Sequence, residues 1–365
     1  MLKRTPFYEK HVAAGGRMVP FAGYELPLQF RGIVAEHLHV RKNVGVFDVS
    51  HMGRIIVRGH DALAFVSRIT TNDPAELEIN QAQYSVMCYD HGGIVDDLVI
   101  YRREDGFLLV VNGANNEKDT KWLRDHISGD VTIENITEQM AQLAVQGPLA
   151  EPALQKISSV PLSPIGFYLA VPCRLAGIDT FLSRTGHTGA DGLEIYFSAR
   201  DAGRLWDALF DAGREFSIEP IGLGARDTLR LEMKMALYGN DIDETTNPLE
   251  AGLSWVVKLD KPGGFIGADA LKRIDAEGVT RRLVCLLMQD SSIPRPRYSV
   301  AANGKTVGYV TSGTMSPSLN QGIALAYVTR DYAKAGTTLT VDIRGRPAPA
   351  LVVKPPFYKQ GSRKQ

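Results

Sequence analysis

The spacing of apolar positions predicts alternating strands and helices over the first 130 residues. The run VGVFDVSHMG, with few charges, leads into them, and Asp61 stands where a helix N-cap is expected. The tripeptide His91-Gly92-Gly93, between two strand-like runs, predicts a hairpin. The predicted elements are strands at 54–59, 81–90, 94–104 and 107–113, and helices over 61–73 and 115–127.

A second cycle of strands and helices follows. The predicted strands are at 141–147, 173–186 and 192–197, and the predicted helices cover 199–216 and 222–235. In the last helix Leu229, Met233 and Leu237 share one helical spacing. Strands followed by helices on one face indicate α+β layers rather than a doubly wound parallel sheet.

From about residue 276 the pattern changes to short strands separated by Pro, Gly, Asn and Ser turns. These strands are predicted at 281–289, 305–313, 322–330 and 337–345. The pattern is typical of a small all-β barrel or sandwich, so we expect a domain boundary near residue 276. Low-complexity segments and internal repeats are absent from the sequence.

Length and charge narrow the function classes. The 365 residues are more than one hydrophobic core usually organises, which predicts two or three domains. Formal net charge is zero, with 41 basic and 41 acidic side chains, and does not favour a nucleic-acid or membrane partner. Three distant cysteines form no disulfide framework, and neither a signal peptide nor a transmembrane run is visible. We therefore expect a reducing compartment, the bacterial cytoplasm or, for a trimmed eukaryotic chain, the mitochondrial matrix.

Standard catalytic and nucleotide-binding motifs are missing from the sequence. It contains no GxGxxG after the first strand, no GxxxxGK[ST], no GxSxG and no HExxH. His37 and His39 are two residues apart and would lie on different faces of a helix, which does not suit a metal site. We expect no metal.

The most informative segment is GGIVDDLVI. On a strand Asp96 shares one face with Ile94 and Leu98, and Asp97 shares the other with Val95 and other apolar residues. A strand buried on both sides puts at least one carboxylate in poorly solvated surroundings, which raises its pKa and lets it exchange protons near neutrality. A paired structural aspartate next to the turn is an equally good interpretation.

Two further polar groups stand out. Glu194 follows the glycine-rich segment SRTGHTGADG, opposite an apolar strand face, where a solvated carboxylate is the ordinary interpretation. It could instead accept two parallel N–H groups of a flat heterocycle. Arg230 follows Asp227 by three residues, so a surface ion pair competes with binding of a ligand carboxylate or carbonyl.

The order of these segments resembles the aminomethyltransferase family, in the T-protein branch of the glycine cleavage system. The resemblance runs from Lys3 to Tyr358. It rests on seven segments in family order: KRTPFYEKHVAAGGRMVPFAGYELPLQF, FDVSHMG, QAQYSVM, GGIVDDLVI, SRTGHTGADGLEI, ARDTLRLEMKMALYG and TSGTMSPSLNQGIALAYV.

This resemblance implies an α+β fold of three domains, cloverleaf-like, with a C-terminal all-β barrel. The folate-binding region would cover 1–275, as two interleaved subdomains (1–50 with 141–275, and 51–140), and the barrel would cover 276–365. The implied reaction moves the one-carbon unit of an aminomethyl group from the lipoyl arm of H-protein to tetrahydrofolate. Its products are 5,10-methylenetetrahydrofolate, ammonia and dihydrolipoyl H-protein. No other cofactor is implied, and we expect a monomer or weak dimer.

The resemblance also implies residue roles. Asp97 matches the catalytic aspartate, and Asp96 would be its structural neighbour. Ammonia loss passes through a cationic centre, which an ionised carboxylate would stabilise. The implied folate contacts are Glu194, Arg230, Tyr84, Met52, Asn112 and His187.

Three positions depart from the family pattern, and two alternatives stay open. His187 stands where Tyr is usual, Ala190 where Glu is frequent and Tyr24 where Trp is common. One alternative is a folate-dependent demethylase acting on a small sulfonium or N-methyl compound. The other is a folate-binding accessory protein of iron–sulfur maturation, although its KGCY-type segment is replaced here by KMALYGN.

Overall fold

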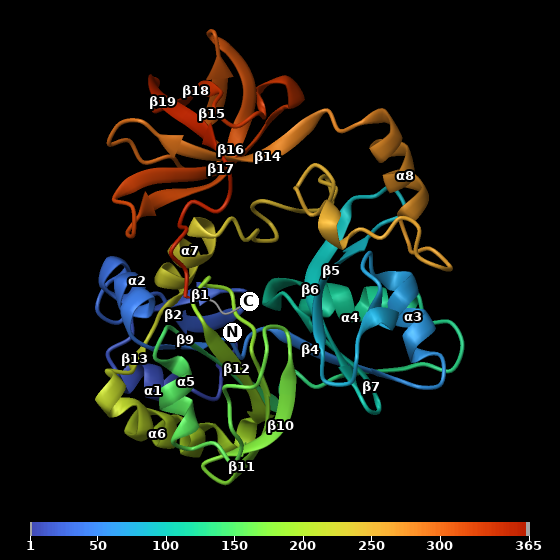
Figure 1. The fold of residues 1–365 in the computed structure, drawn as a ribbon, viewed down its shortest axis with the longest axis vertical. Helices are drawn as coiled ribbons and strands as arrows, with labels where there is room; N and C mark the ends of the chain where they lie inside the picture. Colours follow the sequence, from blue (N-terminus) through green and yellow to red (C-terminus); the bar gives the residue numbers. More distant parts are fainter. Residues whose placement is uncertain (1, 363–365) are drawn as a thin grey trace.

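Three large β-sheets organise the described chain, one in each of three lobes, and β1 (Met18–Phe21) and β2 (Tyr24–Pro27) form a small two-stranded sheet of their own (Figure 1). The computed structural model describes residues 2–362. Two mixed helix-and-sheet lobes lie side by side, and a closed all-β barrel lies above them (Figure 1). The predicted fold class, α+β with a C-terminal barrel, is confirmed.

The first sheet has the strand order β10-β11-β12-β9-β3-β13. Alternate residues of β3 and β9 contact different helices, so the sheet is buried on both faces, by α5 and α6 on one side and by α2 and α7 on the other. The elements of this lobe are α1 (Tyr8–Ala13), β1 (Met18–Phe21), β2 (Tyr24–Pro27), α2 (Ile33–Lys42), β3 (Gly45–Asp48), β9 (Met140–Gln146), α5 (Ala150–Gln155), β10 (Ala170–Leu175), β11 (Ile178–Ser183), β12 (Gly192–Ser198), α6 (Ala202–Gly213), β13 (Glu219–Pro220) and α7 (Leu223–Glu232).

Helix α7 is shorter than the sequence predicted. It ends at Glu232, so Met233 and Leu237 lie beyond it. Lys234 adopts a φ of 59°, a left-handed conformation that a helix cannot continue through.

The second sheet has the strand order β5-β6-β7-β4-β8, and α3 and α4 cover one face of it. Asp61 precedes α3 as predicted but does not cap it, because its carboxylate accepts the Asp130 N–H at 2.8 Å. The elements are β4 (Gly53–Arg58), α3 (Ala62–Ile69), β5 (Ala82–Cys88), β6 (Ile94–Arg103), β7 (Gly106–Val111), α4 (Asn116–Asp125) and β8 (Thr132–Asn135).

The uncovered face of the second sheet packs against the first sheet. Tyr101 of β6 and Tyr196 of β12 are both buried, and their hydroxyls lie 3.1 Å apart. Aromatic and aliphatic side chains from both sheets surround this pair in one core. The two sheets therefore face each other, which brings β6 and β12 together.

A long segment after α7 covers one end of the second sheet. Residues from Ile242 to Val279, including α8 (Ala268–Glu277), share a core with Val86 and Ile94 of that sheet. We had expected 141–275 to group with 1–50. We propose instead that 242–279 belongs to the unit built around 51–140, because these contacts join it to the second sheet.

The C-terminal lobe is a closed barrel with the order β14-β17-β16-β15-β18-β19. Four strands correspond to the predicted ones. The sequence pattern missed two others, one only four residues long and one containing Pro347 and Pro349, residues that disfavour strands. The strands are β14 (Arg281–Met288), β15 (Ser299–Ala302), β16 (Lys305–Ser316), β17 (Gln321–Thr329), β18 (Thr338–Ile343) and β19 (Arg346–Val353).

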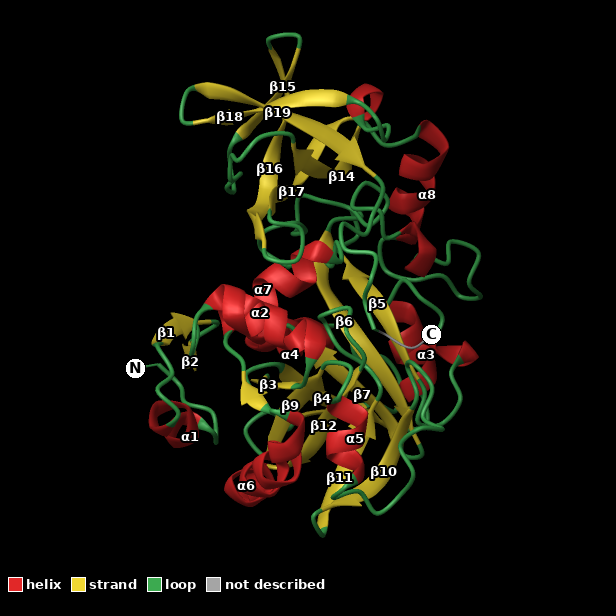
Figure 2. Cartoon of the chain, turned by 60° about the vertical axis from the view of Figure 1, so that its left-hand side comes forward, coloured by secondary structure: helices red, strands yellow, loops and turns green. Residues whose placement is uncertain are grey.

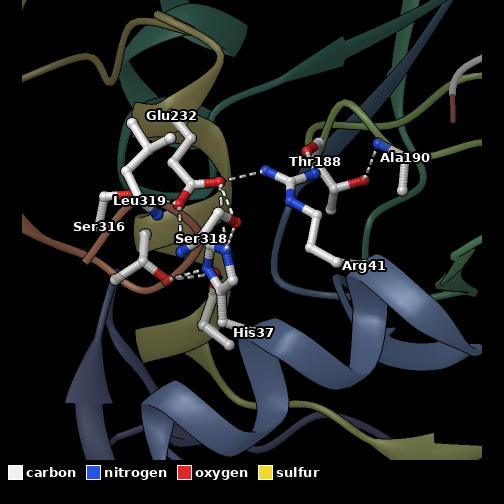
Figure 3. A network of polar contacts seen from close by, with 10 residues as sticks. His37, Arg41, Thr188, Ala190, Glu232, Ser316, Ser318 and Leu319 are labelled. Atoms are coloured by element: carbon white, nitrogen blue, oxygen red, sulfur yellow. Dashed lines mark hydrogen bonds and ion pairs between the residues drawn. The ribbon is translucent and has the colours of Figure 1, made fainter. Parts of the chain in front are cut away.

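Helix α7 lies between the barrel and the first lobe (Figure 2). Glu232, at the end of α7, joins these two lobes (Figure 3). Its completely buried carboxylate pairs with Arg41 of α2 at 2.8 Å and with His37 at 3.2 Å. The barrel contributes the Ser316 and Ser318 hydroxyls, at 2.5 and 2.9 Å. This Glu232 cluster is an anchor between lobes.

All three cysteines are free and buried, as expected for structural thiols. Within residues 2–362, no helix is long and apolar enough to cross a membrane.

Candidate active site

Asp96 and Asp97 point to opposite faces of β6, as strand alternation predicts. Asp96 is completely buried on the side of α4, where the Asn115 amide donates to it at 2.8 Å. Asp97 is half-buried on the face that carries Val99 and Tyr101, toward the first sheet. The two carboxylates therefore have different surroundings although they are neighbours in the chain.

Within the part of the chain that the structure describes, Asp97 accepts side-chain hydrogen bonds only from neutral donors. The Tyr84 hydroxyl donates to one carboxylate oxygen at 2.9 Å, and the Asn112 amide donates to the other at 2.8 Å. Burial, followed by the charge of Asp96, raises the pKa of Asp97 to about 7, and the two donors offset only part of that rise. Asp97 can therefore exchange a proton near neutral pH.

Asn112 connects the two aspartates. Its side-chain amide donates to Asp96 at 2.9 Å as well as to Asp97, and its backbone N–H donates to Asp96 at 3.0 Å. Asn112 lies directly after β7 at the same end of the sheet. Asn112 therefore positions both carboxylates.

Glu194 is not a solvated strand residue. It is half-buried on the face of β12 that carries Tyr196, where Gln142 donates to it at 3.2 Å and Thr185 at 2.5 Å. Because Tyr101 touches Tyr196 and lies four residues from Asp97, roughly 13 Å along the strand, Asp97 and Glu194 lie on the faces of β6 and β12 that are turned toward each other. Met52 packs against two cores, the one that the first sheet forms with α2 and α7 and the one between the two sheets.

Arg230 cannot play the role that the family resemblance implied without losing existing partners. Its side chain is buried, and each of its three guanidinium nitrogens has a partner. They pair with Asp227 twice, at 2.8 and 2.7 Å, and with Asp241, the Met235 carbonyl and Ser312. Arg230 therefore ties α7 to the barrel.

The open cation on the same helix is Arg226, one turn earlier. Within residues 2–362, its half-buried guanidinium has no hydrogen-bond or ion-pair partner. Burial lowers its pKa, and the charge of Glu194 partly offsets this. Both arginines stand in the motif ARDTLR, so the motif was a visible signal, but sequence alone could not tell which one is engaged.

His187 lies close enough to both arginines to feel their charge. Burial, then Arg226 and Arg230, lower the pKa of its half-buried imidazole well below the usual range. The ring is neutral at physiological pH, so it can present a flat face or a polar edge to a ligand.

Two more residues at this end of β6 were not predicted. Trp255 is 62% exposed, and its ring stacks on Tyr84 with centroids 5.8 Å apart. Asp119 of α4 is completely buried near Asp96. Neither carried a sequence signal, because both contacts join residues distant in the chain. Among the described residues, no group of three or more His, Cys, Asp or Glu side chains could hold a metal ion.

The fold and this site suit an enzyme, because β6 carries a carboxylate that can exchange a proton near neutrality and the first lobe carries Glu194 and the unengaged Arg226. The comparisons narrow this class. Residues 7–261 match the family described as "GCVT N-terminal domain", and residues 281–359 match the "Glycine cleavage T-protein C-terminal barrel domain".

The sequence similarity to relatives extends over almost the whole length of the chain. The chain is 48% identical to an aminomethyltransferase of Geobacillus sp. strain WCH70, covering 99% of this chain and 100% of the relative. It is 50% identical to one of Bacteroides thetaiotaomicron, covering 98% and 100%. The crystal structure of the glycine cleavage system aminomethyltransferase T from Bartonella henselae superposes with a TM-score of 0.93 at 34% identity, covering both chains completely. The chain belongs to the glycine cleavage T-protein family and is an enzyme of the aminomethyltransferase type. The comparisons favour neither alternative, the demethylase or the accessory protein.

Proposed function

We propose that this enzyme transfers the one-carbon unit of an aminomethyl group, carried on lipoylated H-protein, to tetrahydrofolate. The products are 5,10-methylenetetrahydrofolate, ammonia and dihydrolipoyl H-protein. The observation that carries the proposal is Asp97, a half-buried carboxylate with a pKa of about 7 and only neutral hydrogen-bond donors.

Asp97 has two roles in this proposal. In its ionised form it stabilises the positive charge that develops as ammonia leaves the aminomethyl carbon, because it acts in a desolvated and preorganised setting. It also accepts a hydrogen bond from, and so orients, the folate nitrogen that attacks. Tyr84 and Asn112 hold its two oxygens in place, so little reorganisation accompanies the reaction.

Glu194 and Arg226 of the first lobe suit a pterin. Glu194 offers carboxylate oxygens to the exocyclic amine and ring N–H, which lie side by side on that ring. Arg226, which has no partner among residues 2–362, offers donors to a carbonyl or to the carboxylates of the folate tail. Met52, Tyr84 and His187 provide apolar and aromatic surface, and we propose them as folate contacts. Arg226 replaces Arg230 in our assignment.

Partner and compartment follow from the same reaction. The lipoylated H-protein is the proposed macromolecular substrate, and we expect no nucleic-acid or membrane partner. Three buried free thiols fit a reducing compartment, so we propose a cytoplasmic enzyme that works as a monomer or weak dimer.

A reconstituted assay tests the function. Purified enzyme is mixed with tetrahydrofolate and aminomethyl-loaded H-protein, and ammonia and 5,10-methylenetetrahydrofolate are measured together. We expect equimolar formation of both, dependent on folate and abolished in the Asp97→Asn variant. Formation of a methylated folate from a sulfonium or N-methyl donor, without ammonia from loaded H-protein, would contradict the proposal.

A further inference from the structure

Asp119 of α4 is a buried carboxyl group that receives no hydrogen bond. Its side chain is completely buried, and neither oxygen has a donor among the described residues. The nearest cation, the Lys118 ammonium, is 3.8 Å away, and it instead donates to the Val95 carbonyl and lies over the Tyr238 ring. An ionised carboxylate in this position would be strongly disfavoured.

The neighbouring carboxyl group is Asp96. Asn115 and Asp119 are four residues apart and so share one face of α4, and the Asn115 amide contacts Asp96 directly. Lys118 of the same helix turn contacts the residue just before Asp96. The Asp119 side chain is thereby directed at β6.

The two carboxyl groups divide the donors unequally. Asp96 accepts three N–H groups, two from Asn112 and one from Asn115, whereas Asp119 accepts none. The side chains of Asp119 and Asp96 are hydrogen-bonding neighbours. Two such buried carboxyl groups do not both ionise, and the one with the N–H donors is the anion. The proton therefore resides on Asp119, consistent with a pKa that burial, and next the charge of Asp96, raise to about 11.

The ionised Asp96 controls the orientation of Asn112. Both carboxylates attract the NH₂ group of this amide, at 2.9 and 2.8 Å. A rotated amide would point its oxygen at two anions. If the proton resided on the Asp96 oxygen that faces the Asn112 side chain, this oxygen could no longer accept from the Asn112 amide, which would be free to rotate.

We propose that Asp119 is a positioning residue of the transfer reaction: held as a neutral acid that donates its proton to Asp96, it keeps Asp96 anionic and so keeps the Asn112 amide on Asp97. The kinetic part of this inference rests on the proposed function, while the protonation state of Asp119 does not.

Two substitutions of similar size separate the roles. Asp119→Asn keeps a neutral side chain with an N–H donor for Asp96, and Asp119→Leu keeps the volume without a donor. We expect Asp119→Asn to retain kcat within about threefold, and Asp119→Leu to lose about tenfold or more in kcat with little change in KM for folate, since small misplacements of reacting groups cost up to ~100-fold.

An infrared measurement tests the protonation state without any assay. The difference spectrum of the parent minus Asp119→Asn at neutral pH should contain the C=O stretch of a protonated carboxylic acid, shifted in D₂O. If that band is absent, Asp119 is ionised and the proposal is wrong. If the band is present but a folded Asp119→Leu enzyme keeps parental kcat, or Asp119→Asn is as impaired as Asp119→Leu, the positioning role is wrong. Failure of the parent itself in the reconstituted assay would instead contradict the proposed function.

Discussion

The Glu232 cluster and the Asp97 site show how partners decide the behaviour of a buried carboxylate. Glu232 accepts from Arg41, from His37 and from two serine hydroxyls. Burial alone would raise its pKa, but His37, Ser316 and Arg41 together lower it to about 2. Asp97 has a phenol, an amide and a neighbouring carboxylate, and its pKa is raised to about 7.

The difference separates an anchor from a reactive group. The Arg41 guanidinium and the hydrogen bonds from the serine hydroxyls keep Glu232 ionised at physiological pH, so that it can hold two lobes together (Figure 3). Neutral partners leave the Asp97 proton exchangeable. Burial and the charge of Asp96 destabilise the ionised form of Asp97 in the folded protein. Removing the Glu232 carboxylate should therefore lower the stability of the fold. Removing the Asp97 carboxylate should lower activity and raise stability.

The largest expected effect is on stability, at the Glu232 cluster. Glu232→Ala leaves Arg41 buried without its carboxylate and should lower the free energy of unfolding by about 3–5 kcal/mol. Urea denaturation measures this, with Glu138→Ala as the control, because the Lys3–Glu138 pair is exposed and such pairs contribute little. A loss no larger than that of the control would show that the cluster is not an anchor.

Asp97→Asn should do the reverse. Losing one preorganised charge should lower kcat by about 10²–10³-fold, with little change in folate affinity. The variant should also be more stable than the parent at pH 7, because the amide carries no charge that burial disfavours. The matched variant is Asp96→Asn; if it lowers kcat more than Asp97→Asn in a folded enzyme, our assignment of the two aspartates is inverted.

Glu194→Gln tests the proposed contact between Glu194 and the pterin. The amide keeps the shape but loses one charge-assisted acceptor, so folate binding should weaken by about 1.5–3 kcal/mol. Isothermal titration calorimetry with tetrahydrofolate measures this, and Glu78→Gln, an exposed residue, is the control. An unchanged dissociation constant would mean that Glu194 does not contact the pterin.

The pH dependence of the free energy of unfolding should distinguish Asp97 from Glu232. The folded pKa of Asp97 lies above its unfolded value, so the stability of the parent relative to Asp97→Asn should fall as pH rises from about 4 to about 7, by at most ~1.4 kcal/mol per pH unit. Over the same range kcat should rise with an apparent pKa of about 7. Glu232 has a depressed folded pKa, so its contribution should be lost only as pH falls from about 4.5 toward 2. A parent-to-variant difference that does not vary with pH would contradict a raised Asp97 pKa.

The smallest expected effect is at His187. His187→Ala should weaken folate binding by about 0.5–1.5 kcal/mol, the range of an aromatic contact, while His187→Tyr should be tolerated. Saturating folate should shift the ring resonances of His187 but not those of His60, whose side chain is 89% exposed. If both histidines are indifferent to folate, His187 is an ordinary loop residue.

Much of the architecture was predictable because it depends on local patterns. The β5–β6 hairpin formed around the Gly-rich turn, α3 and α4 began within a residue or two of their expected starts, and four barrel strands followed their apolar runs. The opposite faces of Asp96 and Asp97 follow from strand geometry alone. The α7 end was wrong because a single left-handed residue, Lys234, outweighed the apolar spacing.

Residue types and their order along the chain determined the family, the barrel and the existence of an unusual carboxylate pair on β6. Only the tertiary structure decided how each charge is used. Arg226 and Arg230 occupy one motif on one helix, yet Asp241 and Ser312, from distant segments, engage Arg230 and leave Arg226 open. The Asp119 carboxyl is neutral because packing places it beside Asp96 without donors. A charge responds to everything within a few ångströms, and most of those neighbours are distant in sequence.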